Sequence, residues 1–326
     1  MIAPLRRLAG ALFSCVEHAV TAALYPWCLL RRRLGAGVRV PILMYHQIGR
    51  PVEGARACRD CVTPERFERQ IRALLEAGYR VVPLATLVRA LREGGTPELE
   101  RSVVLTFDDG YRGQFVHAYP VLRRHRLPAV FFVVAGYLGR YTFFRHLSLE
   151  DAPPARSGSP PLAWLPLSWD EVAEMRHHGI DIGSHSVTHR SLGILSGSEA
   201  EFEARASKEA LEQRLGIRVD LFAYPFGSRV YGDFHRDLEE MLSASGYRGA
   251  CTTVIGRSGA GDDLYALPRI PMENGDGPFR VRCKLAGAYD WVGGVKSFCQ
   301  RFLARRDRVD AGLPAGAGRE PGVRQA

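Results

Sequence analysis

Two pairs of residues in this sequence carry side chains that can bind a metal ion and activate water. The apolar run 102–107 leads directly into Asp108 and Asp109, and a second strand candidate, 180–183, leads into His185 and His189. Two adjacent carboxylates at a strand end point in different directions, so one can bind a cation while the other faces a substrate. Two imidazoles and one carboxylate, with water in the remaining positions, form the open arrangement that activates water for hydrolysis.

Each pair also has a purely structural interpretation. An Asp-Asp-Gly sequence after a strand can cap a helix and form a turn, and two histidines on a surface loop need no ligand. However, both pairs follow strand candidates of a parallel fold, in which the carboxyl ends of the strands face a common rim. The sequence therefore favours a single site that combines the two pairs.

The elements that must position this site alternate as strands and helices do in a parallel α/β fold. Seven short apolar runs are strand candidates: 40–45, 79–82, 102–107, 129–134, 180–183, 220–223 and 248–254. Helices are expected between them, at 64–77, 84–93, 111–126, 168–178, 198–215 and 233–245. Seven strands with intervening helices favour a closed barrel over a flat sheet. The Pro-rich segment 137–166 breaks the alternation and is expected to be an insertion over one rim.

The residues around the predicted site resemble a known family. The segments 106–110 (TFDDG) and 185–189 (HSVTH) look like the first two signature motifs of the polysaccharide deacetylases, the NodB homology family also called carbohydrate esterase family 4. Residues 222–227 (FAYPFG) agree further, and 41–46 (PILMYH) is similar to the branch that contains the poly-N-acetylglucosamine deacetylases. The resemblance covers residues 40–275. It implies a distorted (β/α) barrel, usually seven-stranded, with a divalent metal ion and N-deacetylation of an amino sugar.

The resemblance also implies a role for each matching residue. Asp109, His185 and His189 would be the ligands of one divalent ion, expected to be zinc. Asp108 would be the general base that accepts a proton from the attacking water. The backbone N–H of Phe226 would donate to the oxyanion that forms from the amide carbonyl.

Two positions depart from the family pattern. The family's third motif commonly begins with an arginine that braces the catalytic aspartate, and the matching residue here is Ala223. Arg269 is the candidate for a replacement brace that reaches Asp108, and a surface arginine on an edge strand is the alternative. The family's late Leu-x-His motif, which usually supplies the general acid, has no clear match, because the last histidine is His235. His46, directly after the first strand, is therefore the candidate for proton donation or substrate binding.

These expectations describe a metal-dependent hydrolase that removes N-acetyl groups from an amino-sugar polysaccharide or glycan. Two alternatives stay open. The substrate could be a lipid-linked amino sugar that loses a formyl or acetyl group, or the chain could be a carbohydrate-binding relative whose turnover is weakened by the two departures. The sequence leaves the localisation open among a membrane-associated, a cell-envelope and a cytoplasmic position.

The net charge of +9 does not indicate a nucleic-acid partner, because it is concentrated at the two ends of the chain. Residues 1–39 carry six arginines and one glutamate, and residues 301–326 carry six arginines and three acids. The segment 40–300, with the core motifs at 101–275, keeps a net charge of only +1. We therefore expect a basic N-terminal segment, a barrel and a flexible basic tail, with a glycan and no nucleic acid as the partner.

The N-terminal segment is amphipathic as well as basic. Residues 8–30 are mostly apolar and lie between arginines, but Glu17 interrupts them, and a charge near the centre of a membrane-spanning helix is costly. At helical spacing, one face collects Leu5, Leu8, Leu12, Val16, Val20, Leu24 and Trp27. Three interpretations stay open: a helix on a membrane surface over residues 5–33, an imperfect signal or spanning segment, and a helix packed on the barrel.

The seven cysteines are odd in number and mostly isolated, so they do not describe a disulfide framework. Cys58 and Cys61 form a CxxC sequence, which could be a disulfide or half of a zinc site. A second CxxC sequence or a nearby pair of histidines is missing. The sequence therefore gives this pair no assigned role.

Overall fold

A computed structural model describes residues 2–35, 37–50, 61–140 and 162–298, with the backbone alone for residues 2–12. The segment 301–326, expected to be a basic tail, lies outside the described residues. The same holds for Cys58 and for residues 141–161 of the expected insertion.

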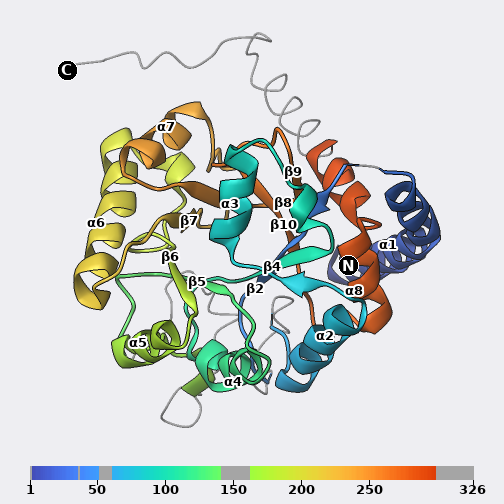
Figure 1. The fold of residues 1–326 in the computed structure, drawn as a ribbon, viewed down its shortest axis with the longest axis horizontal. Helices are drawn as coiled ribbons and strands as arrows, with labels where there is room; N and C mark the ends of the chain where they lie inside the picture. Colours follow the sequence, from blue (N-terminus) through green and yellow to red (C-terminus); the bar gives the residue numbers. More distant parts are fainter. Residues whose placement is uncertain (1, 36, 51–60, 141–161, 299–326) are drawn as a thin grey trace.

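A closed barrel of seven parallel strands forms the centre of the molecule (Figure 1). Around the barrel the strands follow in the order β2 (Ile42–Tyr45), β4 (Ser102–Phe107), β5 (Val130–Val133), β6 (Asp181–Ser184), β7 (Leu221–Ala223), β8 (Gly249–Ile255) and β10 (Leu267–Pro271), and β10 pairs with β2. Because all these pairings are parallel, every strand ends at the same rim. The predicted (β/α) barrel is confirmed.

One of the seven predicted strands is not part of the closed ring. The run at 79–82 forms only β3 (Arg80–Val81), which pairs with the first residues of β4. Its place in the ring belongs to β10, whose sequence LPRIP was not among the strand candidates. Proline is tolerated in a sheet at an irregularity, and the register between β10 and β8 shifts between Leu267 and Arg269, around Pro268. Outside the barrel, β1 (Arg39–Val40) pairs antiparallel with β9 (Ser258–Gly259).

Helices surround the barrel close to the six predicted positions. They are α2 (Pro64–Glu76), α3 (Leu84–Arg92), α4 (Tyr119–Arg124), α5 (Trp169–His177), α6 (Gly197–Leu215) and α7 (Arg236–Ala244). A further helix that was not predicted is α8 (Pro278–Ala286). Short 3-10 turns lie at Pro97–Leu99, Leu162–Trp164 and Leu192–Ile194. Helices α5 and α6 each begin with a capping box, formed by Ser168 with Glu171 and by Ser196 with Glu199. The predicted helix 111–126 is shorter, because Gln114–Ala118 form a π-helical turn before α4.

Alternation along the strands divides the core into two layers. On β4, Leu105 and Phe107 belong to the cluster between the barrel and the helices, whereas Val104 belongs to the cluster inside the barrel. Thr106 lies on the same side of the strand as Val104, because side chains alternate along a strand. Asp108 continues this inner row at the carboxyl end of β4. The alternation of side chains along β4 therefore places the Asp108 carboxylate at the mouth of the barrel.

The N-terminal segment forms a long helix, α1 (Ile2–Arg33), which lies beside the barrel against α8 (Figure 1). Its Tyr25 ring meets the edge of Phe279 at a centroid distance of 5.5 Å. In the part of the chain that the structure describes, no helix combines the length and the hydropathy that crossing a bilayer requires. The packed-helix interpretation is thus correct for one face of α1, and the other face stays open to the surroundings.

Candidate active site

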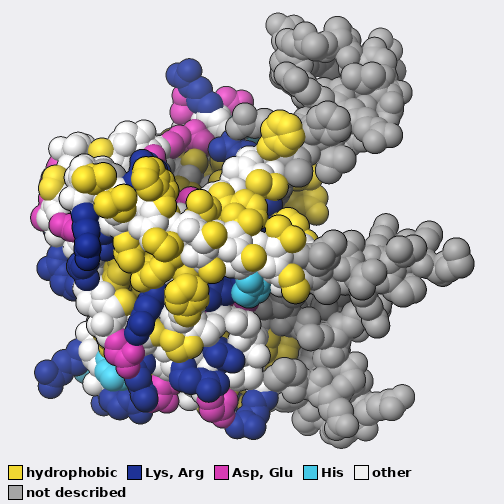
Figure 2. Space-filling model, turned by 90° about the vertical axis from the view of Figure 1, so that its right-hand side faces the viewer, with side chains coloured by type: hydrophobic (Ala, Val, Ile, Leu, Met, Phe, Trp, Pro, Cys, Tyr) yellow, Lys and Arg dark blue, Asp and Glu magenta, His cyan; other side chains and the backbone are white. Residues whose placement is uncertain are grey.

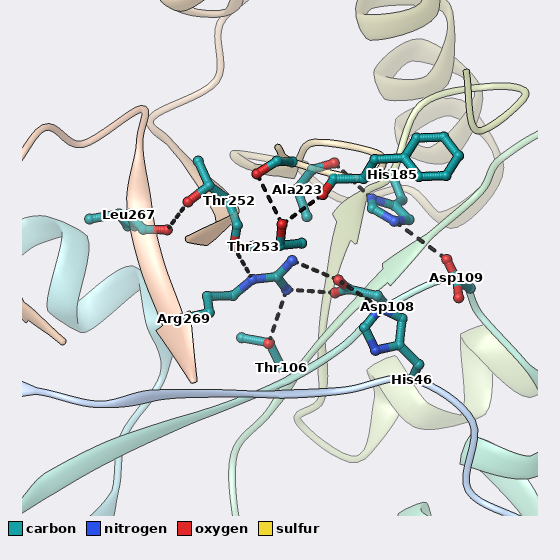
Figure 3. A network of polar contacts seen from close by, with 12 residues as sticks. His46, Thr106, Asp108, Asp109, His185, Ala223, Thr252, Thr253, Leu267 and Arg269 are labelled. Atoms are coloured by element: carbon teal, nitrogen blue, oxygen red, sulfur yellow. Dashed lines mark hydrogen bonds and ion pairs between the residues drawn. The ribbon is translucent and has the colours of Figure 1, made fainter. Parts of the chain in front are cut away.

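Asp108 and Asp109 follow β4 and point in different directions (Figure 3). Asp108 points toward Arg269, and Asp109 points toward His185. The change of direction occurs because Asp109 adopts the left-handed conformation with φ of 73°, followed by Gly110 with φ of 79°. Both carboxylates are buried. The predicted division of the pair into two environments is thus present.

Asp109 lies opposite the two histidines of the loop after β6. Its Oδ1 atom is 3.1 Å from Nε2 of His189 and 3.4 Å from Nε2 of His185. The Nδ1–H of His185 donates to the carbonyl oxygen of Ala223 at 2.7 Å, and this bond turns the Nε2 lone pair toward Asp109. The three ligand atoms lie within 4.8 Å of one another. A buried carboxylate with two imidazoles is the donor set of catalytic metal sites, so these residues fit a divalent cation.

Burial shifts the titration of this group as well. Burial lowers the pKa of His189, and Asp109 beside it acts in the opposite direction. A neutral imidazole is the form that binds a metal ion. Burial of His189 therefore favours the neutral imidazole, which is the form that can bind a metal ion.

Glu203, a buried residue of α6, holds the loop that carries both histidines. Its Oε2 accepts the backbone N–H groups of Val187 at 2.8 Å and Thr188 at 2.9 Å, and its Oε1 accepts the hydroxyl of Thr188. Within the loop, the Ser186 hydroxyl accepts the N–H of His189 at 3.0 Å. A charged acceptor that receives several bonds is a strong anchor. The spacing of the two imidazoles is therefore fixed from behind by α6.

Arg269 holds the other carboxylate. Its guanidinium donates to both oxygens of Asp108, from Nη1 to Oδ1 at 2.7 Å and from Nη2 to Oδ2 at 2.6 Å (Figure 3). The remaining bonds go from Nε to the carbonyl of Thr252 at 2.8 Å and from Nη1 to the hydroxyl of Thr106 at 3.2 Å. Both charged groups are fully buried. The alternative of a surface arginine on an edge strand is wrong, because β10 is a strand of the closed barrel.

The ion pair determines the charge state of Asp108. Burial alone would raise the pKa of the carboxyl group, but the Arg269 guanidinium, together with His185 and His46, outweighs burial and holds the pKa of Asp108 below its ordinary value. The carboxylate is therefore ionised at neutral pH. The two parallel hydrogen bonds also fix its orientation.

His46 follows β2 and faces the same carboxylate. Its Nε2 lies 3.9 Å from Oδ2 of Asp108, and its side chain is 24% exposed, against 1% for Asp108. Gln114, in the π-helical turn, donates from Nε2 to the carbonyl of His46 at 2.9 Å and to the carbonyl of Asp108. This amide therefore ties together the strand ends that carry the two residues.

Phe226 lies in the loop after β7, beside His189. Its half-exposed ring meets the His189 ring edge-on at a centroid distance of 5.0 Å. Thr253 holds the turn, because its hydroxyl donates to the carbonyls of Phe226 at 2.7 Å and Gly227 at 3.0 Å. The backbone N–H of Phe226 donates to no other residue that the structure describes. It is a free donor at the rim of the site.

Left-handed backbone gathers at this rim. Among the described residues, six non-glycine residues have a positive φ. Four of them belong to the site loops: Asp109, Ser186, His189 and Phe226. The loops after β4, β6 and β7 thus each turn their functional residue toward the centre through a conformation that L-residues rarely adopt.

Three residues that support the site were not predicted: Gln114, Glu203 and Asp233. Asp233 is buried, accepts the backbone N–H of Ser228 at 2.8 Å and the hydroxyl of Ser191, and so joins the loops after β6 and β7. Glu203 had a signal in the sequence, since it shares the buried stripe of α6 with Ala200 and Ala204. A carboxylate on such a stripe needs a partner. Gln114 and Asp233 had no comparable signal.

A closed parallel barrel that gathers carboxylates and histidines at the carboxyl ends of its strands has the architecture of a barrel enzyme. Residues 95–250 match the family described as polysaccharide deacetylase. With the two motifs and the fold, this match shows that the chain carries a polysaccharide deacetylase domain over residues 95–250. It is therefore a hydrolase.

Curated relatives agree with this assignment. One relative is YxkH of Bacillus subtilis, which is provisionally named a polysaccharide deacetylase. It is 28% identical to this chain over 240 residues, which cover 73% of this chain and 72% of YxkH. A poly-β-1,6-N-acetyl-D-glucosamine N-deacetylase of Staphylococcus epidermidis is 25% identical over 222 residues, covering 65% of this chain and 68% of that protein.

Solved structures show the same fold. The deacetylase PplD of Streptococcus pyogenes, in complex with acetate, superposes with a TM-score of 0.62 at 25% identity, covering 77% of this chain and 99% of PplD. IcaB of Ammonifex degensii superposes with a TM-score of 0.61 at 22% identity, covering 77% of this chain and 98% of IcaB. The second likeness concerns the fold alone.

Proposed function

We propose that this protein removes N-acetyl groups from an amino-sugar glycan. The observation that carries the proposal is the position of Asp108, held by Arg269, beside the group formed by Asp109, His185 and His189. A carboxylate base and a set of metal ligands at one barrel mouth suit the hydrolysis of an amide. The relatives named as poly-β-1,6-N-acetyl-D-glucosamine N-deacetylases support an acetylated amino-sugar polymer as the substrate.

Asp109, His185 and His189 would hold one divalent cation, and two imidazoles with one carboxylate favour zinc. A cation held there supplies a Lewis acid and lowers the pKa of water. His185 is prepared for this role by its bond to the carbonyl of Ala223. The buried Glu203 prepares the loop.

Asp108 accepts the proton of the attacking water. The carboxylate is ionised and oriented by Arg269, so it is ready to act as the general base at neutral pH. The N–H of Phe226 donates to the carbonyl oxygen as negative charge develops on it. His46, the more exposed group beside Asp108, donates a proton to the nitrogen of the departing amino sugar or binds the sugar. The products are acetate and the free amine.

Acetate release tests the proposal. The purified chain is incubated with chitooligosaccharides, poly-N-acetylglucosamine and lipid-linked amino sugars, with and without a chelator, beside an Asp108→Asn variant. We expect release from at least one acetylated glycan that the chelator abolishes and that Asp108→Asn reduces by about 10²–10⁴-fold. Glycan binding without release would instead support the carbohydrate-binding alternative, and release from lipid-linked sugars alone would support the lipid-linked substrate.

A further inference from the structure

Beside the contact of Tyr25 with Phe279, two polar side chains anchor helix α1 to the protein. Glu17 is buried, with 8% of its surface exposed, and accepts a hydrogen bond from the guanidinium of Arg280 on α8. Thr21, one turn later, is 2% exposed and accepts from Nε1 of Trp291 at 3.2 Å. The charge that interrupts the apolar N-terminal run is thus the residue that anchors the helix to the protein.

A neighbouring face of α1 carries exposed apolar side chains. Val16 is 48% exposed, Trp27 is 56% exposed and Leu30 is 46% exposed. Val16 and Trp27 are about three helical turns apart and Leu30 is nearly one turn further on, so these side chains lie on one side of the helix as an apolar stripe. Figure 2 looks onto this side of the molecule and shows hydrophobic side chains gathered across it. A helix docked on a protein normally buries its apolar side chains, whereas α1 leaves Val16, Trp27 and Leu30 about half exposed.

Positive charge borders the stripe at its carboxyl-terminal end. Arg31 and Arg33 are exposed there, and a cavity of about 750 Å³ opens beside Arg31. The charged residues that line this cavity are Arg31, Arg32, Arg39, Arg101, Arg257, Glu100 and Asp290. The lining therefore has an excess of positive charge. A partner for this face needs an apolar interior and an anionic surface.

We propose that α1 is an interfacial helix that binds an anionic lipid bilayer. Its polar face stays docked on α8 through Glu17 and Thr21, and its apolar stripe enters the boundary between headgroups and acyl chains. Trp27 lies near the basic end, where an amphipathic ring suits the interface, and the arginines contact lipid phosphates. Because α1 is docked on α8, binding of the helix holds the whole protein at the bilayer surface. This inference does not depend on the deacetylase proposal.

Vesicle flotation tests the inference with the full chain. The vesicles contain phosphatidylcholine alone or phosphatidylcholine with phosphatidylglycerol. One variant carries Val16→Ser with Trp27→Ser, and another carries Arg31→Gln with Arg33→Gln. The matched control is Phe202→Ser, because Phe202 is 62% exposed on α6, which lies on the opposite side of the barrel from α1 (Figure 1).

We expect the parent to float with vesicles that contain phosphatidylglycerol and to lose this binding at high salt. The apolar variant binds at least tenfold more weakly, since it withdraws two side chains from the interface. Each arginine removed weakens binding about fivefold, the equivalent of about 1 kcal/mol per charge near an anionic surface. Phe202→Ser binds as the parent does.

Equal binding of the parent and the apolar variant would overturn the inference, as would failure of the parent to bind either vesicle. Analytical sedimentation without lipid provides a further check. A parent protein that is a dimer, and that becomes a monomer in the Val16→Ser with Trp27→Ser variant, would identify a second copy as the occupant of the stripe and overturn the inference. Acetate release from a soluble oligosaccharide is measured on the same variants. Unchanged release beside lost flotation separates this inference from the proposed chemistry.

Discussion

Replacement of Arg269 by methionine removes the cation that holds Asp108 and keeps a side chain of similar length inside the barrel. Arg269→Met deletes both bonds to the carboxylate, at 2.6 and 2.7 Å, and leaves Asp108 fully buried. Burial, the largest single influence on this group, is then opposed only by His185 and His46, and the pKa of Asp108 rises. The acidic limb of the rate profile therefore moves to higher pH, because the base must be deprotonated to accept a proton.

The size of the effect follows from the burial of the pair. Two unit charges about 4 Å apart attract by about 4 kcal/mol at an effective dielectric constant of about 20, and removal of one partner of a buried pair costs about 3–5 kcal/mol of folding free energy. At an unfolding entropy of about 2.1 cal/mol/K per residue, the melting temperature should fall by roughly 4–7 °C for a chain of this size. A misaligned or protonated base lowers the rate at neutral pH by about 10²–10⁴-fold.

The sign of the pH dependence follows from the lowered pKa of Asp108. The ionised pair stabilises the fold above the unfolded-state pKa of an aspartate, about 3.9, and this contribution is lost as the pH falls through the lower folded-state value. At neutral pH the parent therefore has the full contribution, and Arg269→Met lacks it.

The measurements are acetate release against pH, thermal unfolding and metal content. Arg218→Met is the matched control, because it breaks a pair with Asp220 at 3.1 Å in which the arginine is 76% exposed, and such pairs contribute about 0–1 kcal/mol. Arg269→Lys keeps the charge without the two parallel bonds and should retain more of the acidic limb than of the rate. If Arg269→Met leaves the rate and the acidic limb unchanged, the brace is not needed. An arginine introduced by Ala223→Arg in the Arg269→Met background should recover part of the activity.

Asp109→Ala with His185→Ala should abolish the binding of one divalent ion per chain, and full metal content in the double variant, measured by elemental analysis, would contradict the ligand assignment. Asp108→Asn should lower the rate by about 10²–10⁴-fold with almost unchanged metal content, and a variant with more than half of the parent rate would exclude Asp108 as the base. Glu203→Gln should weaken metal affinity by about 10–100-fold, as loss of a supporting carboxylate does, whereas the exposed Glu201→Gln on the same helix should leave the affinity as it is.

The strand ends were the predictable part of the site. Apolar runs that stop at polar residues define where a parallel barrel opens, and this placed Asp108, Asp109, His185 and His189 at one rim before any distance was known. Which strands form the closed barrel was less predictable. The prolines of β10 argue against a strand, and the apolar run at 79–82 has the composition of a barrel strand although it forms only β3.

Contacts across the chain account for what could not be predicted. Glu203 supports a loop fifteen to sixteen residues before it, and Asp233 joins loops that meet only in the folded barrel. The orientation of α1 depends on Arg280, which lies 263 residues after Glu17 in the sequence. Periodicity separates the faces of a helix, but only the partner determines which face is covered.

The left-handed residues at the rim place the conformational cost of the fold in its functional loops. Each such non-glycine residue costs about 1–2 kcal/mol, and the strands beneath them carry no such cost in the described chain. The loops after β4, β6 and β7 therefore depend on the hydrogen bonds around them, such as those from Glu203 and Thr253, to offset this cost. Ser186→Gly would lower the conformational cost at this position, but it would also remove the hydroxyl that accepts the backbone N–H of His189.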